Sequence, residues 1–380
     1  MFTIPLNDVL DKLPAAELEQ TLEAFVAPLV ERLPDQRLKR MVPRAVRGIL
    51  TSETPVITAM ARSTSRTEAD PWPAAKRLYR FVKNKRFNHR TLFKGLYRVA
   101  RQTVAREKPA YLVVALDPVN FEKPYTHALE GVSTVRKSTP PDLSGQARLG
   151  RGYPAITATV VNTQVPAISY ANWFSYTTGD FVSQSREFYR AIRTTRWVFP
   201  QQRLRFVADS ELDDQKVFAW LAQEQAEFVI VAKHRERRVE IYNPRLDRWE
   251  SETLQDLVDT VPWEATFRVA FRHAGRTRLA NVQFGWFLIR LPETHQRLWV
   301  LVAEDDLEHR TLVLLTNVPL DTIERVQEVY QDWRLRGRVE HGYRFDQEQG
   351  LDVVEYHRPM SSSLIRLCRA MILDQSKTCE

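Results

Sequence analysis

The chain has 380 residues, of which 43% are hydrophobic and 10% aromatic, and it carries a formal net charge of +8. This length and composition predict a globular protein of two or three domains and argue against intrinsic disorder. No run of eighteen apolar residues occurs and the first residues include charges, so neither a membrane span nor a signal peptide is predicted, and we expect a cytoplasmic protein. Cys368 and Cys379 have no CxxC or Cys/His neighbours, which argues against a disulfide framework or a zinc site.

The positive charge is concentrated between Pro71 and Lys108. This segment holds twelve Lys and Arg against one acid, a local net charge of +11, so the remainder of the chain is slightly negative. Apolar residues recur there at helical spacing, which predicts helices with a buried stripe and outward-facing bases. Such a surface suits a polyanion, most plausibly nucleic acid, and the alternative is a solvated helical face. The candidate DNA contacts in this segment are Lys76, Arg77, Arg80, Lys83, Lys85 and Arg86.

The sequence pattern changes twice along the chain. Residues 1–108 read as a helical, basic DNA-binding domain, and from 109 to 234 short strands alternate with helices. Residues 235–317 read as successive strands, which we interpret as a β-rich insertion. A capping-box pattern at Asp321–Glu324 opens a helix within 318–356, and 357–380 reads as a helical tail. The predicted fold class is α/β, a mixed sheet flanked by helices.

Two aspartates each end an apolar run that predicts a buried strand, Tyr111–Asp117 and Leu204–Asp209. Because ligands of open sheets gather at the carboxyl ends of strands, we expect these two carboxylates to converge. Asp117 precedes Pro118 and could instead simply terminate its strand. Asp209 has neighbouring acids as rivals, namely Glu211, Asp213 and Asp214, of which Asp213 could cap the next helix.

Glu340 follows these aspartates on the predicted helix of residues 318–356. Arg336 and Trp333 lie one and two turns before it, and Arg344 and Gln347 one and two turns after. One acid among bases, an aromatic and an amide suits phosphates bridged by a metal ion. Glu340 could instead form a surface ion pair with Arg336 or Arg344, and Trp333 could pack beneath the helix or stack on a nucleotide.

A long segment rich in Gly, Pro and basic residues, residues 136–153, is predicted to be a loop. It follows the Asp117 strand. Its bases Arg136, Lys137, Arg148 and Arg151, together with Lys123, are expected to line a DNA channel.

Taken in order, these features resemble the DDE transposases of cut-and-paste bacterial insertion sequences, which have an RNase H-like catalytic core. One group of these enzymes carries a Y-x2-R-x3-E-x6-K signature. Aligning its glutamate with Glu340 puts Arg336 at the arginine, Trp333 at the tyrosine and Gln347 at the lysine. Two signature positions therefore match, one is a different aromatic and one has lost its charge. The resemblance covers about residues 60–355 and describes a divergent relative of this group.

The resemblance implies an enzyme that cleaves DNA at the inverted-repeat ends of its element and joins the ends to target DNA. Asp117, Asp209 and Glu340 would be the catalytic acids and would hold two Mg²⁺ ions, with Mn²⁺ as a substitute, since carboxylates are the hard oxygen ligands that these ions favour. It also implies double-stranded DNA as partner, a homodimer that synapses two ends, and association with the bacterial nucleoid.

Some relatives use a tryptophan of the insertion to stack a flipped base during hairpin formation. The corresponding residue here is Leu312, with Trp286 or Trp299 as substitutes. Two alternative functions stay open: an RNase H-like nuclease without strand transfer, and a transposase-derived DNA-binding regulator that has lost catalysis.

Overall fold

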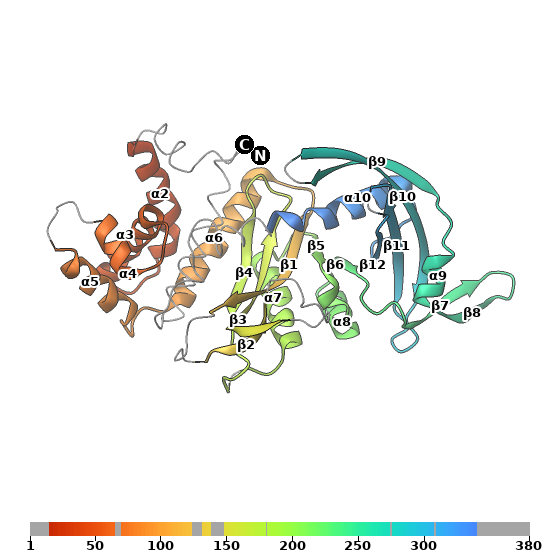
Figure 1. The fold of residues 1–380 in the computed structure, drawn as a ribbon, viewed down its shortest axis with the longest axis horizontal. Helices are drawn as coiled ribbons and strands as arrows, with labels where there is room; N and C mark the ends of the chain where they lie inside the picture. The colour runs from red at the N-terminus through yellow and green to blue at the C-terminus, as the bar shows by residue number, and fades with distance from the viewer. Residues whose placement is uncertain are drawn as a thin grey trace. The chain divides into compact units, whose positions relative to one another are not determined.

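The computed structural model describes residues 15–64, 70–123, 131–137, 148–179, 181–273, 276–307 and 309–339. The chain is a mixed α/β protein in which N-terminal helices precede a large open sheet with flanking helices (Figure 1). The N-terminal helices are α2 (Ala15–Val30), α3 (Gln36–Ser52), α4 (Ile57–Ser63), α5 (Trp72–Val82) and α6 (His89–Glu107).

These helices form because apolar residues recur along one face of each and are buried together. Leu29, Val42, Ile49, Met60 and Leu78 are all at most 2% exposed within one hydrophobic cluster. Close packing of α2 against α6 depends on a glycine, since a Cβ on Gly95 would lie 2.5 Å from the Pro28 carbonyl oxygen. The expectation that residues up to 108 are helical is confirmed for the described part of that segment.

Twelve strands form one mixed sheet in the order β2-β3-β1-β5-β6-β12-β11-β10-β7-β8, with β4 paired to β3 and β9 to β10. The β5–β6 pair is parallel, whereas β2–β3, β3–β4 and the successive pairs from β6–β12 to β7–β8 are antiparallel, as is β9–β10. The strands are β1 (Leu112–Glu122), β2 (Ser133–Arg136), β3 (Leu149–Val160), β4 (Ala167–Trp173), β5 (Leu204–Ala208), β6 (Glu227–Val231), β7 (Arg238–Asn243), β8 (Arg248–Thr253), β9 (Ala265–His273), β10 (Arg276–Arg290), β11 (Arg297–Asp305) and β12 (Thr311–Thr316).

The remaining helices lie between these strands and after them. They are α7 (Gln184–Val198), the short 3₁₀ helix η1 (Ser210–Leu212), α8 (Gln215–Gln223), α9 (Leu254–Asp259) and α10 (Ile323–Arg334). The predicted alternation of strands and helices, and the later run of strands, are therefore confirmed.

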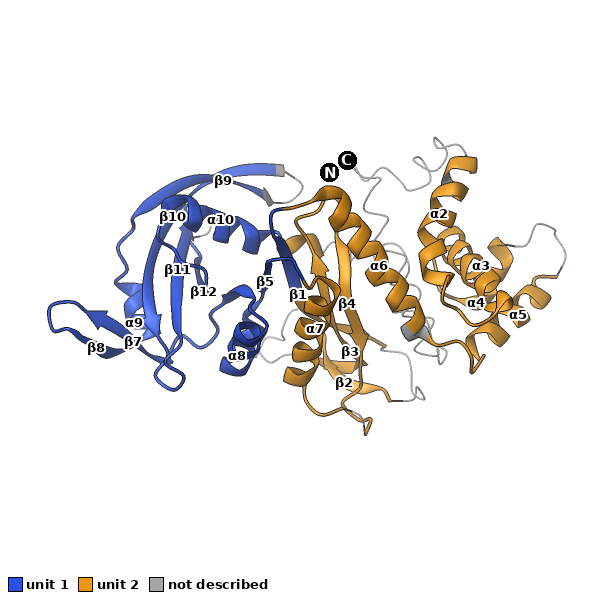
Figure 2. Cartoon of the chain, turned by 180° about the vertical axis from the view of Figure 1, so that it is seen from behind, with its two compact units in different colours: residues 1–3, 110–115, 201–336 blue, residues 4–109, 116–200, 337–380 orange. Residues whose placement is uncertain are grey.

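The chain divides into two compact units (Figure 2). Unit 1 contains residues 1–3, 110–115 and 201–336, and unit 2 contains 4–109, 116–200 and 337–380. Strand β1 starts in unit 1 and ends in unit 2, so Asp117 belongs to unit 2 and Asp209 to unit 1.

Two expectations about the first strands are wrong. Asp117 does not end its strand, because β1 runs on through Pro118 to Glu122. Proline is compatible with a strand where its missing N–H is not needed for pairing. The predicted loop of residues 136–153 is wrong at its ends, which belong to β2 and β3 and pair with each other, Arg136 with Leu149 and Thr134 with Arg151. Residues 138–147 lie outside the described residues.

The predicted long helix around Glu340 is also wrong in its continuity. Helix α10 ends at Arg334, where the Leu335 N–H bonds to the carbonyls of both Gln331 and Asp332 and so tightens the last turn. A separate helical turn begins at Gly337, a residue type that disfavours a helix interior. The helix also begins differently, because Thr322 and not Asp321 is its N-cap and accepts a hydrogen bond from the Arg325 N–H.

Candidate functional site

Asp209 follows β5 directly, as the sequence predicts. Its Oδ1 accepts a hydrogen bond from the Ser210 N–H at 2.7 Å, which caps η1 and fixes the start of the turn. The side chain remains 48% exposed. Asp209 therefore presents an accessible carboxylate at the carboxyl end of a buried strand.

The C-terminal end of α10 approaches this carboxylate. Arg336 Nη1 lies 3.7 Å from Asp209 Oδ2, and the Arg336 guanidinium carbon lies 5.8 Å from the centroid of the Trp333 ring. Trp333 is half-buried, and its Nε1 donates a hydrogen bond to the carbonyl oxygen of Ala208, the last residue of β5, at 3.3 Å. The structure therefore brings Asp209, Trp333 and Arg336 together. The hydrogen bond to β5 agrees with the packing interpretation of Trp333.

Asp209 is distinguished from its acidic rivals by its surroundings. Asp213 is buried, accepts hydrogen bonds from the N–H groups of Lys233 and His234, and forms an ion pair with Arg237. Asp214 is the N-cap of α8, so the expectation that Asp213 fills this role is wrong. Glu211 is exposed on η1.

The other two predicted acids are placed differently. Asp117 is half-buried within β1, in unit 2. The strand order makes β1 and β5 neighbours, and the convergence of Asp117 with Asp209 stays a prediction. Glu340, Arg344 and Gln347 lie outside the described residues.

The helical turn just before Glu340 is held by an arginine. Arg338 donates hydrogen bonds to the carbonyl oxygens of Val161, Thr163 and Gln164, the last two at 2.7 and 2.8 Å. Burial lowers the pKa of the Arg338 guanidinium, and Glu107 opposes this shift. The neighbouring Val339 is 2% exposed. The chain that leads to Glu340 is thus anchored to the segment after β3.

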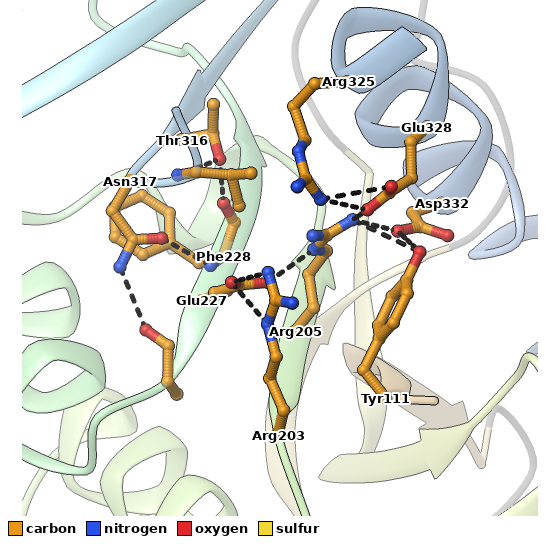
Figure 3. Close-up of polar contacts among 12 residues, drawn as sticks. Tyr111, Arg203, Arg205, Glu227, Phe228, Thr316, Asn317, Arg325, Glu328 and Asp332 are labelled. Carbon is orange, nitrogen blue, oxygen red and sulfur yellow. Dashed lines mark hydrogen bonds and ion pairs between the residues drawn. The ribbon is translucent and has the colours of Figure 1, made fainter. Parts of the chain in front are cut away.

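A buried arginine links β5 to α10 (Figure 3). Arg205, fully buried in β5, donates to Glu227 of the neighbouring strand β6 at 2.9 Å, to Glu328 at 2.6 Å and to Asp332. Glu328 and Asp332 lie one turn apart on α10, so one guanidinium binds both. Arg203 also donates to Glu227, and Arg325 donates to Glu328, which completes a network of three arginines and three acids.

Tyr111 covers this network from its position just before β1. Its ring centroid lies 4.5 Å from the Arg205 guanidinium carbon, and its hydroxyl donates to Asp332 at 2.8 Å. Burial raises the pKa of the Tyr111 hydroxyl, and the Asp332 charge adds to this. Burial also raises the pKa of Asp332, against the attraction of Arg205. Glu328 shifts the other way: burial would raise its pKa, but the hydrogen bond and charge of Arg205 outweigh burial and lower it.

Within the described residues, no group of three or more His, Cys, Asp and Glu side chains is arranged to hold a metal ion. Asp209 offers one partly exposed carboxylate, a hard oxygen donor of the kind that Mg²⁺ favours, and its role as a metal ligand stays a prediction. Asp209 is the one proposed metal ligand that unit 1 contributes.

The predicted solvent exposure of the bases in the segment from Pro71 to Lys108 is confirmed for the six candidate DNA contacts. Leu78, Phe81 and Phe87 are buried, and the six bases chosen from this segment are all exposed: Lys76, Arg77, Arg80, Lys83, Lys85 and Arg86. Lys76 also lies 5.6 Å from the ring of the exposed Trp72. Helix α5 and the turn after it thus present these six bases to solvent.

The basic side chains of the β2–β3 hairpin and of Lys123 differ in solvent exposure. Arg136, Arg148 and Arg151 are exposed. Arg151 pairs with Thr134, and Arg136 lies two residues after Thr134 on β2, so Arg136 and Arg151 share one face of the hairpin. Lys137 is half-buried and packs over Gly150. Lys123 is only 1% exposed, so the expectation that it lines a DNA channel is wrong.

The candidates for base stacking lie on one face of the sheet. Trp286 pairs with Leu301 and Trp299 with Leu288, so strand alternation puts both indoles on the same side of β10 and β11. Leu312 pairs with Ala303 and faces the same way. Both tryptophans are half-buried.

Two sets of residues were missed from the sequence. The Arg205 network was missed because an arginine inside an apolar run reads as an interruption, although Glu328 and Asp332 at i,i+4 were a signal for a shared partner. A row of arginines on α3 was missed because it precedes the denser basic segment. The absence of any acid from Gln36 to Ser52 was the available signal.

No protein-family model matches this chain, and no curated protein matches it significantly. Among the residues described, no helix is both long and apolar enough to cross a membrane.

Proposed function

We propose that this chain is a DDE transposase that cleaves DNA at the ends of an insertion sequence and joins those ends to target DNA. The observation that carries the proposal is the placement of Asp209, Arg336 and Trp333 at the carboxyl end of β5. Leaving the short strand β2 aside, β1 and β5 are the first and fourth strands along the chain, and their adjacency supports an RNase H-like core.

Each residue has a role in this proposal. Asp117, Asp209 and Glu340 would hold two Mg²⁺ ions, which would supply activation of the attacking oxygen and stabilisation of the leaving one. Arg336 binds a phosphate oxygen beside the cleaved bond, because a guanidinium donates two parallel hydrogen bonds to such a group. Trp333 holds the end of α10 against β5 and thereby fixes where Arg336 points. Arg344 and Gln347, which follow Glu340 in the sequence, also contact the DNA.

The exposed bases support a DNA substrate. The bases of α5 and of the turn after it form the main binding surface of an N-terminal DNA-binding domain, and Arg136, Lys137, Arg148 and Arg151 extend the contact. Two DNA ends must be brought together and each chain has one acid triad, so the active form is a homodimer that works on the nucleoid in the cytoplasm.

Cleavage of end DNA tests this function. Wild type and Asp209→Ala are incubated in Mg²⁺ with labelled DNA that carries the genomic sequences flanking the coding region, and the products are separated on a denaturing gel. We expect cleaved and joined products from the wild type alone. Asp214→Ala is the matched control, because it removes a nearby carboxylate that caps α8.

The alternatives predict other products. Cleavage without joining supports an RNase H-like nuclease. Binding by both proteins without cleavage by either supports a DNA-binding regulator and contradicts the proposal. Hairpin products would implicate the face of β10 and β11 that carries Trp286 and Trp299.

A further inference from the structure

Helix α3 carries a row of arginines on one side. Arg37, Arg40, Arg44 and Arg47 follow each other at intervals of three, four and three residues, the spacing that lines up side chains along one face. No Asp or Glu occurs between Gln36 and Ser52. The row therefore has no acidic neighbour on its own helix.

The direction of this row is fixed by the opposite face. Leu38, Val42, Ala45, Val46 and Ile49 are all at most 1% exposed in the hydrophobic cluster of unit 2. The helix start is fixed as well, since the N-cap Asp35 accepts a hydrogen bond from the Leu38 N–H at 2.8 Å. α3 cannot rotate its arginines inward without exposing this core face.

Three of the four arginines are exposed and unpaired among the described residues. Arg47 forms an ion pair with Glu19 of α2. Arg37, Arg40 and Arg44 are exposed and form no side-chain hydrogen bond or ion pair with any residue that the structure describes. Like charges at this spacing destabilise an isolated helix by about 0.2–0.5 kcal/mol per pair. The stability of the fold therefore does not account for the row.

The chemistry of the row favours one kind of partner. A helix that lies on a membrane needs a free apolar face, and the apolar face of α3 is already buried. Guanidinium groups match phosphate oxygens, and Arg37 to Arg44 span roughly 10 Å at about 1.5 Å per residue. This length corresponds to about three base pairs of one DNA strand at roughly 3.4 Å each.

We propose that α3 lies against the backbone of double-stranded DNA, with Arg37, Arg40 and Arg44 each contacting a phosphate. This inference rests on the proposed function, since it takes DNA as the partner, but it assigns a second contact surface separate from the bases of α5. The contacts are independent of base sequence and add to affinity through release of counterions.

The test is the salt dependence of binding to a labelled random-sequence DNA duplex without metal. The variant Arg37→Gln/Arg40→Gln/Arg44→Gln keeps good helix formers on α3. The matched control Arg186→Gln/Arg193→Gln/Lys216→Gln removes three exposed bases from α7 and α8. We expect the α3 variant to lower the slope of log affinity against log salt by about 2.7, at about 0.9 per phosphate, and the control to leave it unchanged.

The outcomes separate this inference from the proposed function. If wild type does not bind the duplex, the proposed function fails together with the inference. If wild type binds and the α3 variant has the same slope, the inference alone is overturned. If the α3 variant binds RNA or anionic vesicles more weakly than wild type but binds DNA equally well, the inference is also overturned.

A second variant covers a failure of the triple variant to fold, which circular dichroism would reveal. Arg40→Glu changes one exposed position and is expected to weaken binding more than Arg40→Gln, because the new carboxylate repels the phosphate that the arginine attracted. Equal binding by these two single variants contradicts a phosphate at this position.

Discussion

Arg336 Nη1 lies 3.7 Å from Asp209 Oδ2, so the carboxylate that we propose as a metal ligand is paired with a cation of the chain. Asp209 comes from the end of β5, and Arg336 comes from the turn after α10. The ion pair is 48% exposed on the aspartate side, which leaves the carboxylate open to exchange partners.

We predict that Arg336→Gln lowers the Mg²⁺ concentration needed for half-maximal DNA cleavage, because the variant removes a cation that competes for Asp209. The maximal rate should fall at the same time, since the variant also lacks the guanidinium proposed to bind phosphate. Titration of cleavage rate with Mg²⁺ measures both quantities. Arg334→Gln is the control, because Arg334 donates to the Ala270 carbonyl oxygen instead. An unchanged Mg²⁺ requirement in Arg336→Gln would contradict competition at Asp209.

Replacing Arg205 should destabilise unit 1 far more than replacing its neighbour Arg203. Arg205→Gln leaves the buried Asp332 and the half-buried Glu328 without their shared cation, which we expect to cost about 3–5 kcal/mol. Arg203→Gln removes an exposed partner of Glu227 and should cost less than about 1 kcal/mol. Urea unfolding of both variants gives the two free energies. Similar values for the two would mean that the network does not tie α10 to β5.

Glu328 and Asp332, the two acids of α10 that bind Arg205, should respond to pH in opposite directions. The folded pKa of Glu328 is lowered, so its stabilisation is present above its unfolded pKa and is lost as pH falls through the folded value. The folded pKa of Asp332 is raised, so its contribution is present below its unfolded pKa and is lost as pH rises through the folded value.

Unfolding free energies measured across the acidic range test these signs. Glu328→Gln should reduce the loss of stability on acidification relative to wild type, whereas Asp332→Asn should steepen it. If both variants change the loss of unfolding free energy at low pH in the same direction, the opposed pKa shifts of Glu328 and Asp332 are contradicted.

Gly95→Ala should destabilise unit 2. A Cβ at this position would lie 2.5 Å from the Pro28 carbonyl oxygen and 2.6 Å from the Leu29 Cα, so α2 and α6 must separate. We expect a cost of about 1–3 kcal/mol, the usual range for overpacking. Gly337→Ala is the matched control, since a Cβ there meets no heavy atom within 4 Å. Thermal unfolding that ranks Gly337→Ala below Gly95→Ala in stability would contradict this packing.

Replacing Lys83, Lys85 and Arg86 together should weaken DNA binding and flatten its salt dependence, by about 0.9 for each phosphate that these bases no longer neutralise. All three are exposed in the turn between α5 and α6. The same salt titration measures the effect, and Arg186→Gln/Arg193→Gln/Lys216→Gln again serves as the control. A slope equal to that of wild type would move the DNA-binding surface away from this turn.

The sequence by itself determined the features that depend on local periodicity. The helices before residue 108, the strand before Asp209, helices α7 and α8 and the later run of strands all follow from apolar spacing, and the basic segment follows from charge. Tertiary structure decided how these elements are joined and terminated. Pairing with neighbouring strands carries β1 past Asp117 and turns the ends of the predicted loop into β2 and β3, because the backbone groups of these strands satisfy one another's hydrogen bonds.

Long-range contacts also decided which charges meet. Spacing along the predicted helix placed Arg336 one turn before Glu340, which lies outside the described residues. The structure shows that α10 ends at Arg334 and that the turn after it carries Arg336 to Asp209. Arg205 gathers Glu227, Glu328 and Asp332 from a neighbouring strand and a helix more than a hundred residues away in sequence. Local sequence patterns do not predict such pairings, because a buried charge requires partners that only the folded chain brings together.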